Sequence, residues 1–167
     1  SHGPAYYLRY PKEFEQFTPV CKSNQLQKCS ELALNNTYDN TILYTDYFLN
    51  KTINLLDNLP ENYNSSLIYI SDHGESLGEN HLYLHGTPYF IAPESQTHVP
   101  FFTWMSQSFS DVFGVNRSCL KIKQNQTLSH DNIFHSVLGF MQINTRMYNP
   151  KLDVFNTCEK HFMIGSN

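Results

Sequence analysis

The sequence lacks several features, and each absence excludes a class of protein. No run of about 18 apolar residues occurs, so no segment predicts a membrane-spanning helix. Lysines and arginines do not gather into a cluster, and the formal net charge is −4, so nothing indicates binding to nucleic acid. Repeats and low-complexity segments are also absent, which excludes a solenoid or a disordered linker.

The composition that is present is typical of a folded, polar and aromatic protein. Hydrophobic residues make up 40% of the 167 residues and aromatic residues 14%, whereas charged residues make up only 16%. The chain begins SHGPAYYLRYP, with neither a methionine nor a charged signal region. We therefore expect residues 1–167 to be a portion of a longer protein, with any targeting information upstream.

Four cysteines, Cys21, Cys29, Cys119 and Cys158, stand in polar, loop-like surroundings, and none forms a CxxC zinc pair. An even number at loop positions favours two disulfides and an oxidising compartment. We expect the pairs Cys21–Cys29 and Cys119–Cys158. The alternative is four buried free thiols in a cytosolic protein.

Hydrophobic periodicity predicts two helices and two strands. Apolar positions at spacings of three and four from Tyr38 to Leu56 predict a long helix that starts after Asn35 or Asn36 and ends before Pro60. A second helix is expected after residues 129–132, with Ile133, Phe134, Val137, Leu138 and Met141 on its apolar face. The runs 66–70 and 99–104 predict strands, the first a buried central one. This order of elements favours an α/β fold.

Candidate metal ligands directly follow the first predicted strand. Ligands of open α/β sheets lie at the carboxyl ends of strands, and Asp72 and His73 follow such an end. A carboxylate oxygen and an imidazole nitrogen are ligands that Zn²⁺ accepts, and Gly74 permits a sharp turn. Glu75 either supports a ligand through hydrogen bonds or holds the local backbone. His85, again followed by glycine, returns from the far side of a polar loop.

These stretches resemble a known family. SDHGESLGEN, YLHG, APE and VPFF, together with SHGPAYYLRYP, FTPVC and TYDN, are similar to the lipid A phosphoethanolamine transferases, which include the mobile colistin-resistance enzymes. That group belongs to the alkaline phosphatase/sulfatase superfamily. The resemblance covers residues 1 to about 104 well and thins afterwards. It implies a sulfatase-like sheet flanked by helices, present here as a partial domain.

The resemblance also implies roles for individual residues. Asp72 and His73 correspond to ligands of a catalytic Zn²⁺, and His2 and His85 to substrate-side catalytic residues that hold the phosphoryl group or protonate a leaving oxygen. The family's threonine nucleophile and glutamate ligand would precede Ser1, so neither is in this chain. The Cys21–Cys29 pair matches a family disulfide.

The reaction that the resemblance implies is zinc-dependent transfer of phosphoethanolamine from phosphatidylethanolamine to lipid A or a related envelope glycan, through a threonine intermediate. The whole protein would carry an N-terminal membrane domain and work at the periplasmic face of the bacterial inner membrane. Its product would lower the negative surface charge and give resistance to polymyxin. Two alternatives remain open: another enzyme of the superfamily (a sulfatase, phosphodiesterase or phosphoglycerol transferase), or an inactive structural fragment. The isolated 167 residues are expected to be inactive.

Overall fold

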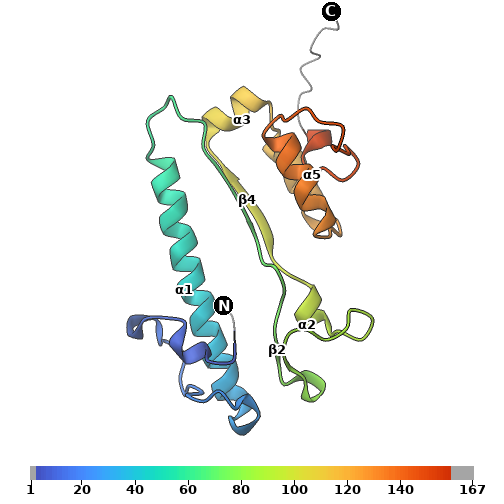
Figure 1. Ribbon diagram of the computed structural model, residues 1–167. Helices are drawn as coiled ribbons and strands as arrows, with labels where there is room; N and C mark the ends of the chain where they lie inside the picture. Colours follow the sequence, from blue (N-terminus) through green and yellow to red (C-terminus); the bar gives the residue numbers. More distant parts are fainter. Residues whose placement is uncertain (1–2, 159–167) are drawn as a thin grey trace, which may run out of the picture. The chain divides into compact units, whose positions relative to one another are not determined.

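The computed structural model describes residues 3–158 and combines helices and strands (Figure 1). The α-helices and strands are α1 (Glu31–Asp57), β1 (Ser66–Ile70), β2 (Ser76–Leu77), β3 (Tyr83–Leu84), α2 (Glu94–Thr97), β4 (Phe101–Met105), α3 (Gln107–Phe113), α4 (Arg117–Ile122) and α5 (Asp131–Phe140). Short 3₁₀ turns include η1 (Tyr6–Leu8) and η4 (Glu79–His81).

The chain divides into two compact units. The first takes in the chain through Asn58 together with Leu67–Trp104, and the second takes in Leu59–Ser66 together with the chain from Met105 onward. The first unit contains the Asp72–His73 pair, so it carries the predicted chemistry.

The long helix α1 starts five or six residues earlier than the sequence predicts, at Glu31 instead of after Asn35 or Asn36. Its N-cap is Ser30, whose side chain accepts a hydrogen bond from the Ala33 N–H, and this cap satisfies a backbone donor of the first turn. The predicted caps at Asn35 and Asn36 are therefore wrong. The expected end before Pro60 is confirmed, since the helix stops at Asp57. Among the described residues, no helix combines the length and apolar character that a membrane crossing needs.

A polar residue, rather than the predicted apolar row, anchors the buried face of α1. Asn40 is fully buried, and its Oδ1 accepts the N–H groups of Gln16 and Phe17, each at 2.9 Å. Its Nδ2 donates to the Phe17 carbonyl at 2.9 Å. Ile42, predicted on the packed face, is 49% exposed. The N-terminal loop covers the Asn40 side of the helix because three backbone groups find their partners there.

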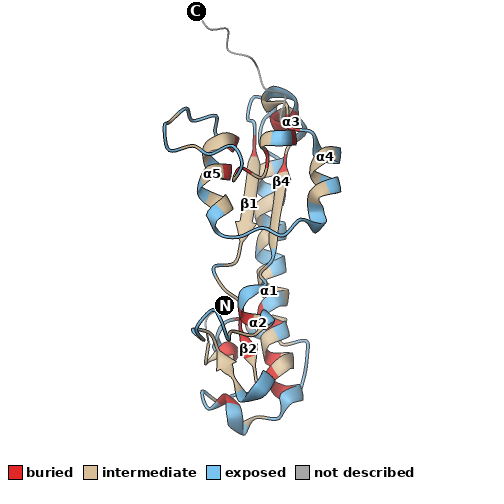
Figure 2. Ribbon diagram, turned by 90° about the vertical axis from the view of Figure 1, so that its right-hand side faces the viewer, coloured by how far each residue is buried: buried red, intermediate tan, exposed pale blue. Residues whose placement is uncertain are grey.

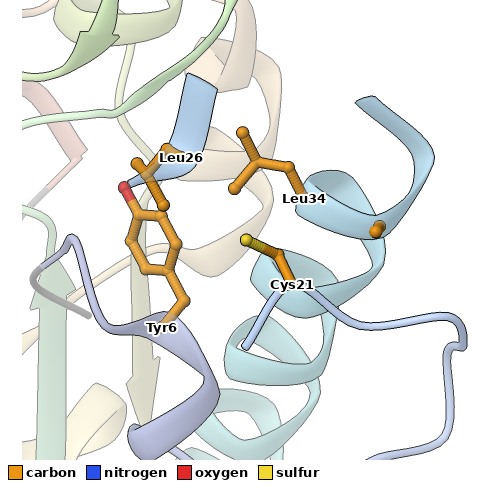
Figure 3. Packing of buried hydrophobic residues seen from close by; sticks show 5 residues of the cluster. Tyr6, Cys21, Leu26 and Leu34 are labelled. Carbon is orange, nitrogen blue, oxygen red and sulfur yellow. The ribbon is translucent and has the colours of Figure 1, made fainter. Parts of the chain in front are cut away.

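The core of the first unit surrounds a disulfide. Figure 3 shows Tyr6, Cys21, Leu26 and Leu34 packed together. Cys21 bonds Cys29, which confirms the predicted short-loop pair and excludes four free thiols. Three partly buried side chains of the hairpin that follows β1 pack on this cluster: Leu77, Tyr83 and Leu84. The N-terminal segment and the hairpin are thus held on one apolar cluster.

Both predicted strands are present, and they pair with each other. β1 has the predicted bounds, and Pro100 stands immediately before β4, as expected of a residue that cannot donate to the ladder. The Ser71 N–H, just after β1, donates to the Pro100 carbonyl at 3.3 Å, and the Ser106 N–H, just after β4, donates to the Ser65 carbonyl at 2.9 Å. The end of each strand therefore meets the start of the other, so the strands run antiparallel. The expectation of a fully buried strand is wrong for the described residues, because every residue of β1 is only partly buried (Figure 2).

In the second unit, helix α5 forms where predicted but packs through a different face. Ser136 and Phe140 are buried, whereas Phe134 is 54% exposed. The chain that follows the helix decides this. Ser136 Oγ accepts the Val154 N–H at 3.0 Å, and the rings of Phe140 and Phe155 lie 4.7 Å apart.

The second predicted disulfide is also confirmed. Cys119 on α4 bonds Cys158, which lies 39 residues further along the chain. The Asn116 N–H donates to the Cys158 carbonyl at 2.8 Å beside it. The bridge therefore ties the end of the described chain to α4.

Candidate metal and phosphoryl-transfer site

The turn after β1 is held by its own side chains. Ser71 Oγ donates to the His73 carbonyl at 2.8 Å, and Asp72 Oδ1 accepts the His73 N–H at 3.1 Å. Gly74 N–H donates to the Gln96 carbonyl at 3.0 Å. A Cβ on Gly74 would stand 2.0 Å from the Ser95 carbonyl oxygen, so only glycine fits this close approach. The turn is thereby clamped against α2.

Asp72 and His73 occupy the outer side of this turn. The Asp72 side chain is 87% exposed, and its Oδ2 lies 3.7 Å from Nε2 of His73. Two ligands of a tetrahedral Zn²⁺, each about 2.0–2.2 Å from the ion, lie about 3.3–3.6 Å apart. The two atoms therefore fit a shared ion after a shift of a few tenths of an ångström.

A backbone contact sets the tautomer of His73. Its Nδ1 lies 2.8 Å from the Gly74 carbonyl oxygen, which can only accept a hydrogen bond, so Nδ1 carries a proton. In the neutral ring Nε2 then holds the lone pair. This arrangement, in which one ring nitrogen donates to a carbonyl, is typical of histidines that ligate metals through the other nitrogen.

Behind His73 lies a buried carboxylate, Glu75, whose side chain is only 3% exposed. Its Oε1 receives Nδ1 of His85 at 2.6 Å, and its Oε2 receives the Tyr6 hydroxyl. The rings of His73 and His85 lie 3.9 Å apart between centroids. Glu75 therefore joins the turn after β1 to two other segments, those of Tyr6 and His85.

Tyr6 acts as a hydrogen-bond donor to Glu75. Burial, followed by the hydrogen bond to Glu75, raises the pKa of Tyr6 above its ordinary value, so the hydroxyl keeps its proton. The neighbouring Tyr38, whose ring meets Tyr6 edge to face, has its pKa raised by burial and then by the Glu75 charge.

A short hairpin brings Glu75 and His85 together. β2 and β3 pair antiparallel with Ser76 opposite Leu84 and Leu77 opposite Tyr83. One further step along this register places Glu75 opposite His85. The polar loop between His73 and His85 therefore contains this hairpin, and Glu79 Oε2 closes its connection by accepting the Leu77 N–H at 2.7 Å.

A second polar contact set supports the hairpin from behind. The buried Gln96 donates from Nε2 to Ser76 Oγ at 2.8 Å and accepts the Thr87 N–H on Oε1 at 3.2 Å. Its backbone carbonyl is the partner of Gly74 noted above. Gln96 thus joins the turn after β1, strand β2 and the segment after His85 at one place.

The structure brings some of the predicted site residues together and leaves others apart. Within residues 3–158, the side chains whose ligand atoms lie within 4.8 Å of one another are those of His73, Glu75 and His85. Asp72 is not a member of this group, although its Oδ2 lies 3.7 Å from Nε2 of His73. His2 lies outside the described residues. Sequence reasoning missed Tyr6 and Gln96, since neither a tyrosine nor a glutamine forms a metal-ligand pattern.

Comparison with known proteins relates this site to characterised relatives. Residues 1–143 match the Sulfatase family. The chain is 48% identical over 161 residues to phosphoethanolamine transferase EptA of Escherichia coli (strain K12), covering 96% of this chain and 29% of that protein. It is 51% identical over 143 residues to phosphatidylethanolamine transferase Mcr-1 of Escherichia coli, covering 86% and 25% respectively.

A solved structure shows the same fold. The integral membrane protein lipooligosaccharide phosphoethanolamine transferase A (EptA) from Neisseria meningitidis superposes with a TM-score of 0.91 at 46% identity. The match covers 96% of this chain and 30% of that one. The chain thus spans less than a third of the length of the relatives named here.

Proposed function

Because the chain belongs to the sulfatase family, we propose that it is the C-terminal part of a zinc-dependent phosphoethanolamine transferase domain. The observation that carries the proposal is the placement of Asp72 and His73 beside the Glu75–His85 pair at the end of β1. The names of the most similar relatives support the donor, phosphatidylethanolamine, and an acceptor of the lipid A or lipooligosaccharide class.

In this proposal Asp72 Oδ2 and His73 Nε2, which lie 3.7 Å apart at the turn, would hold the Zn²⁺ together with ligands from an upstream segment. The ion would supply positive charge to the transferring phosphoryl group and lower the pKa of the attacking hydroxyl. Gly74 keeps both ligands in place by its contact with α2. The His73 proton on Nδ1 fixes the ring so that Nε2 serves the ion.

The attacking group would be a threonine hydroxyl of the upstream segment. Its oxygen gives up its proton to water and forms a bond to the donor phosphorus while the bond to the diacylglycerol oxygen breaks, and that oxygen leaves with a proton. His85 is the residue we assign to hold the phosphoryl group or to supply that proton, and His2 is its proposed companion. A phosphate oxygen of the acceptor then forms a bond to the same phosphorus while the bond to the threonine oxygen breaks, and the threonine oxygen takes up a proton again.

Two observations support an upstream segment. The chain spans 29% of the Escherichia coli EptA length, and the Neisseria relative is an integral membrane protein. In addition, Phe48 and Leu55 on α1 are mostly exposed, which suits a helix whose remaining face is covered by further sequence. We therefore place the whole protein in the inner membrane, with this part in the periplasm.

Reconstitution tests the proposed function. The full-length enzyme, incubated with phosphatidylethanolamine carrying a fluorescent acyl chain and with lipid A, should release fluorescent diacylglycerol and yield lipid A of greater mass. The isolated 167 residues should release none, and adding the upstream segment should restore release. Turnover by the isolated chain would contradict the division of the site. Release of free phosphoethanolamine without modified lipid A would instead indicate a hydrolase.

Metal content tests the ligand assignment separately. In the full-length enzyme, the double variant Asp72→Ala/His73→Ala should hold less than half the zinc of the parent, measured by mass spectrometry of the metal. His98→Ala is the matched control, since His98 is an exposed histidine whose Nδ1 lies 3.2 Å from Glu94 Oε1. Unchanged zinc in the double variant would refute the assignment.

A further inference from the structure

The Glu75 carboxylate connects His85 to a residue that sequence reasoning does not select. Tyr6 and Glu75 are 69 positions apart in sequence, yet the tyrosine hydroxyl donates to Oε2 while His85 Nδ1 donates to Oε1. The tyrosine is 1% exposed and the carboxylate side chain 3%, so both are withdrawn from water. A buried carboxylate needs such donors, and here each of its oxygens has one.

We propose that Tyr6 is a positioning residue for the transfer reaction, acting on His85 through Glu75. The tyrosine hydroxyl fixes the orientation of the carboxylate, and the fixed carboxylate holds the proton of His85 on Nδ1. Nε2 is then the ring nitrogen that faces the transferring phosphoryl group, and it donates its hydrogen bond or its proton when the ring is protonated on both nitrogens. This inference rests on the proposed function for the part that concerns the reaction, but the placement of the proton can be measured without it.

The geometry gives Tyr6, Glu75 and His85 distinct roles in this set of hydrogen bonds. Since a carboxylate oxygen accepts, Nδ1 of His85 must carry a proton to lie 2.6 Å from it, whichever charge the ring has. A carboxylate with one donor can rotate and offer either oxygen, whereas one held on both oxygens cannot. The Tyr6 ring is itself fixed, because it lies in the apolar cluster and meets Tyr38 edge to face.

The surroundings of Gly3 offer a second way to disturb the hydrogen bond between Tyr6 and Glu75. A Cβ built on Gly3 would stand 2.4 Å from Leu84 Cδ2 and 2.8 Å from the Tyr6 hydroxyl oxygen. The backbone of the N-terminal segment therefore lies directly against this hydroxyl and against the residue that precedes His85. A methyl group at this position must displace one or both, without removing any polar atom.

Three variants of the full-length enzyme test the proposal. Tyr6→Phe deletes only the hydroxyl, and Gly3→Ala displaces it; each should lower kcat about tenfold with KM changed less than about twofold, the range seen when a histidine loses its supporting group. Glu75→Gln should lower kcat at least as far. Adding Tyr6→Phe to Glu75→Gln should cost nothing more, since the hydroxyl acts only through the carboxylate.

Tyr10→Phe is the matched control. Tyr10 is a buried tyrosine of the same segment, but its hydroxyl faces Asn40 Nδ2 at 3.5 Å. The control should melt no higher than the parent and keep its kcat. If Tyr6→Phe and Tyr10→Phe lower the rate alike, or if Tyr6→Phe and Glu75→Gln add independently, the proposal is overturned.

Long-range ¹H–¹⁵N NMR of enzyme labelled in histidine supplies a readout that does not depend on transfer. The parent should show His85 with its proton on Nδ1, and Tyr6→Phe should show a mixture with the Nε2–H form. A parent spectrum dominated by Nε2–H, or a Tyr6→Phe spectrum identical to the parent, would refute the inference even if transferase activity is found. A parent with the expected tautomer but without transferase activity would refute only the proposed function.

Discussion

Replacing Gly74 with alanine should disable the site more than the size of a methyl group suggests. The added Cβ would stand 2.0 Å from the Ser95 carbonyl oxygen and 3.2 Å from Gln96 Cα. The first distance is 1.4 Å short of the 3.4 Å at which ordinary contact begins. Because the nearest atoms belong to the backbone, no side-chain rotation relieves the clash, and the turn after β1 must move away from α2.

The energetic cost follows from three contributions. Overpacking costs about 1–3 kcal/mol, and a backbone clash lies at the upper end of that range. The hydrogen bond from Gly74 N–H to the Gln96 carbonyl is lost with the shift, at about 1 kcal/mol. Alanine also lowers the conformational entropy of the unfolded chain, and this offsets roughly 0.5–1 kcal/mol of the loss in stability. The net loss in the free energy of unfolding is about 3–3.5 kcal/mol.

The effect on activity should be larger, since Gly74 stands between His73 and Glu75. A displacement near 1 Å in a reacting group costs about 100-fold in rate. Transferase rate and thermal melting of the full-length enzyme would measure the two effects together. Gly86→Ala is the control: its Cβ would meet nothing within 4 Å, and its φ of +92° predicts a loss of only about 1–2 kcal/mol from backbone strain. A Gly74→Ala enzyme with parental melting and rate would show that the close approach to Ser95 does not exist.

Two further predictions concern stability. Replacing both cysteines of a bridge by serine should cost about 4 kcal/mol for Cys119–Cys158 and about 2.5 kcal/mol for Cys21–Cys29, because the sequence separations are 39 and 8. Urea titration should rank the two variants in that order, and the reverse order would contradict the loop-length argument. Burial raises the pKa of Tyr6, so its contribution to stability is fully present below the ordinary tyrosine pKa of about 10 and is lost as pH rises above it. Tyr6→Phe should flatten the alkaline fall in melting temperature, and an unchanged fall would exclude Tyr6 as its source.

Local patterns predicted several elements because short-range physics decides them. The bounds of β1 follow from a short apolar run between polar residues, and Pro100 marks the start of β4 because it cannot donate to a ladder. The prediction of helix α1 was correct in type but not in its start. The helix begins earlier because the Ser30 side chain, and not that of a later asparagine, caps its first turn. Its buried face was mispredicted because Asn40 satisfies a loop backbone, a contact that hydrophobic periodicity does not register.

The candidate site divides in the same way. Asp72 and His73 are adjacent in the chain, so their closeness is dictated by covalent geometry and is visible in the sequence. The pairing of Glu75 with His85 depends on the register of β2 with β3, and a shift of one residue would turn both side chains to the opposite face. Sequence reasoning left Glu75 between a supporting role and a structural one, and its distance of 2.6 Å from His85 Nδ1 favours the supporting role that we propose.

What the sequence alone determined, then, is the chemistry on offer: an acid and an imidazole at a strand end, cysteines able to pair, and the expectation of an α/β domain. Tertiary structure alone decided which groups meet, because Tyr6 reaches Glu75 across 69 positions only when the N-terminal segment and the hairpin pack on one apolar cluster. The free energy of that packing belongs to many residues at once, so no single stretch of sequence records it.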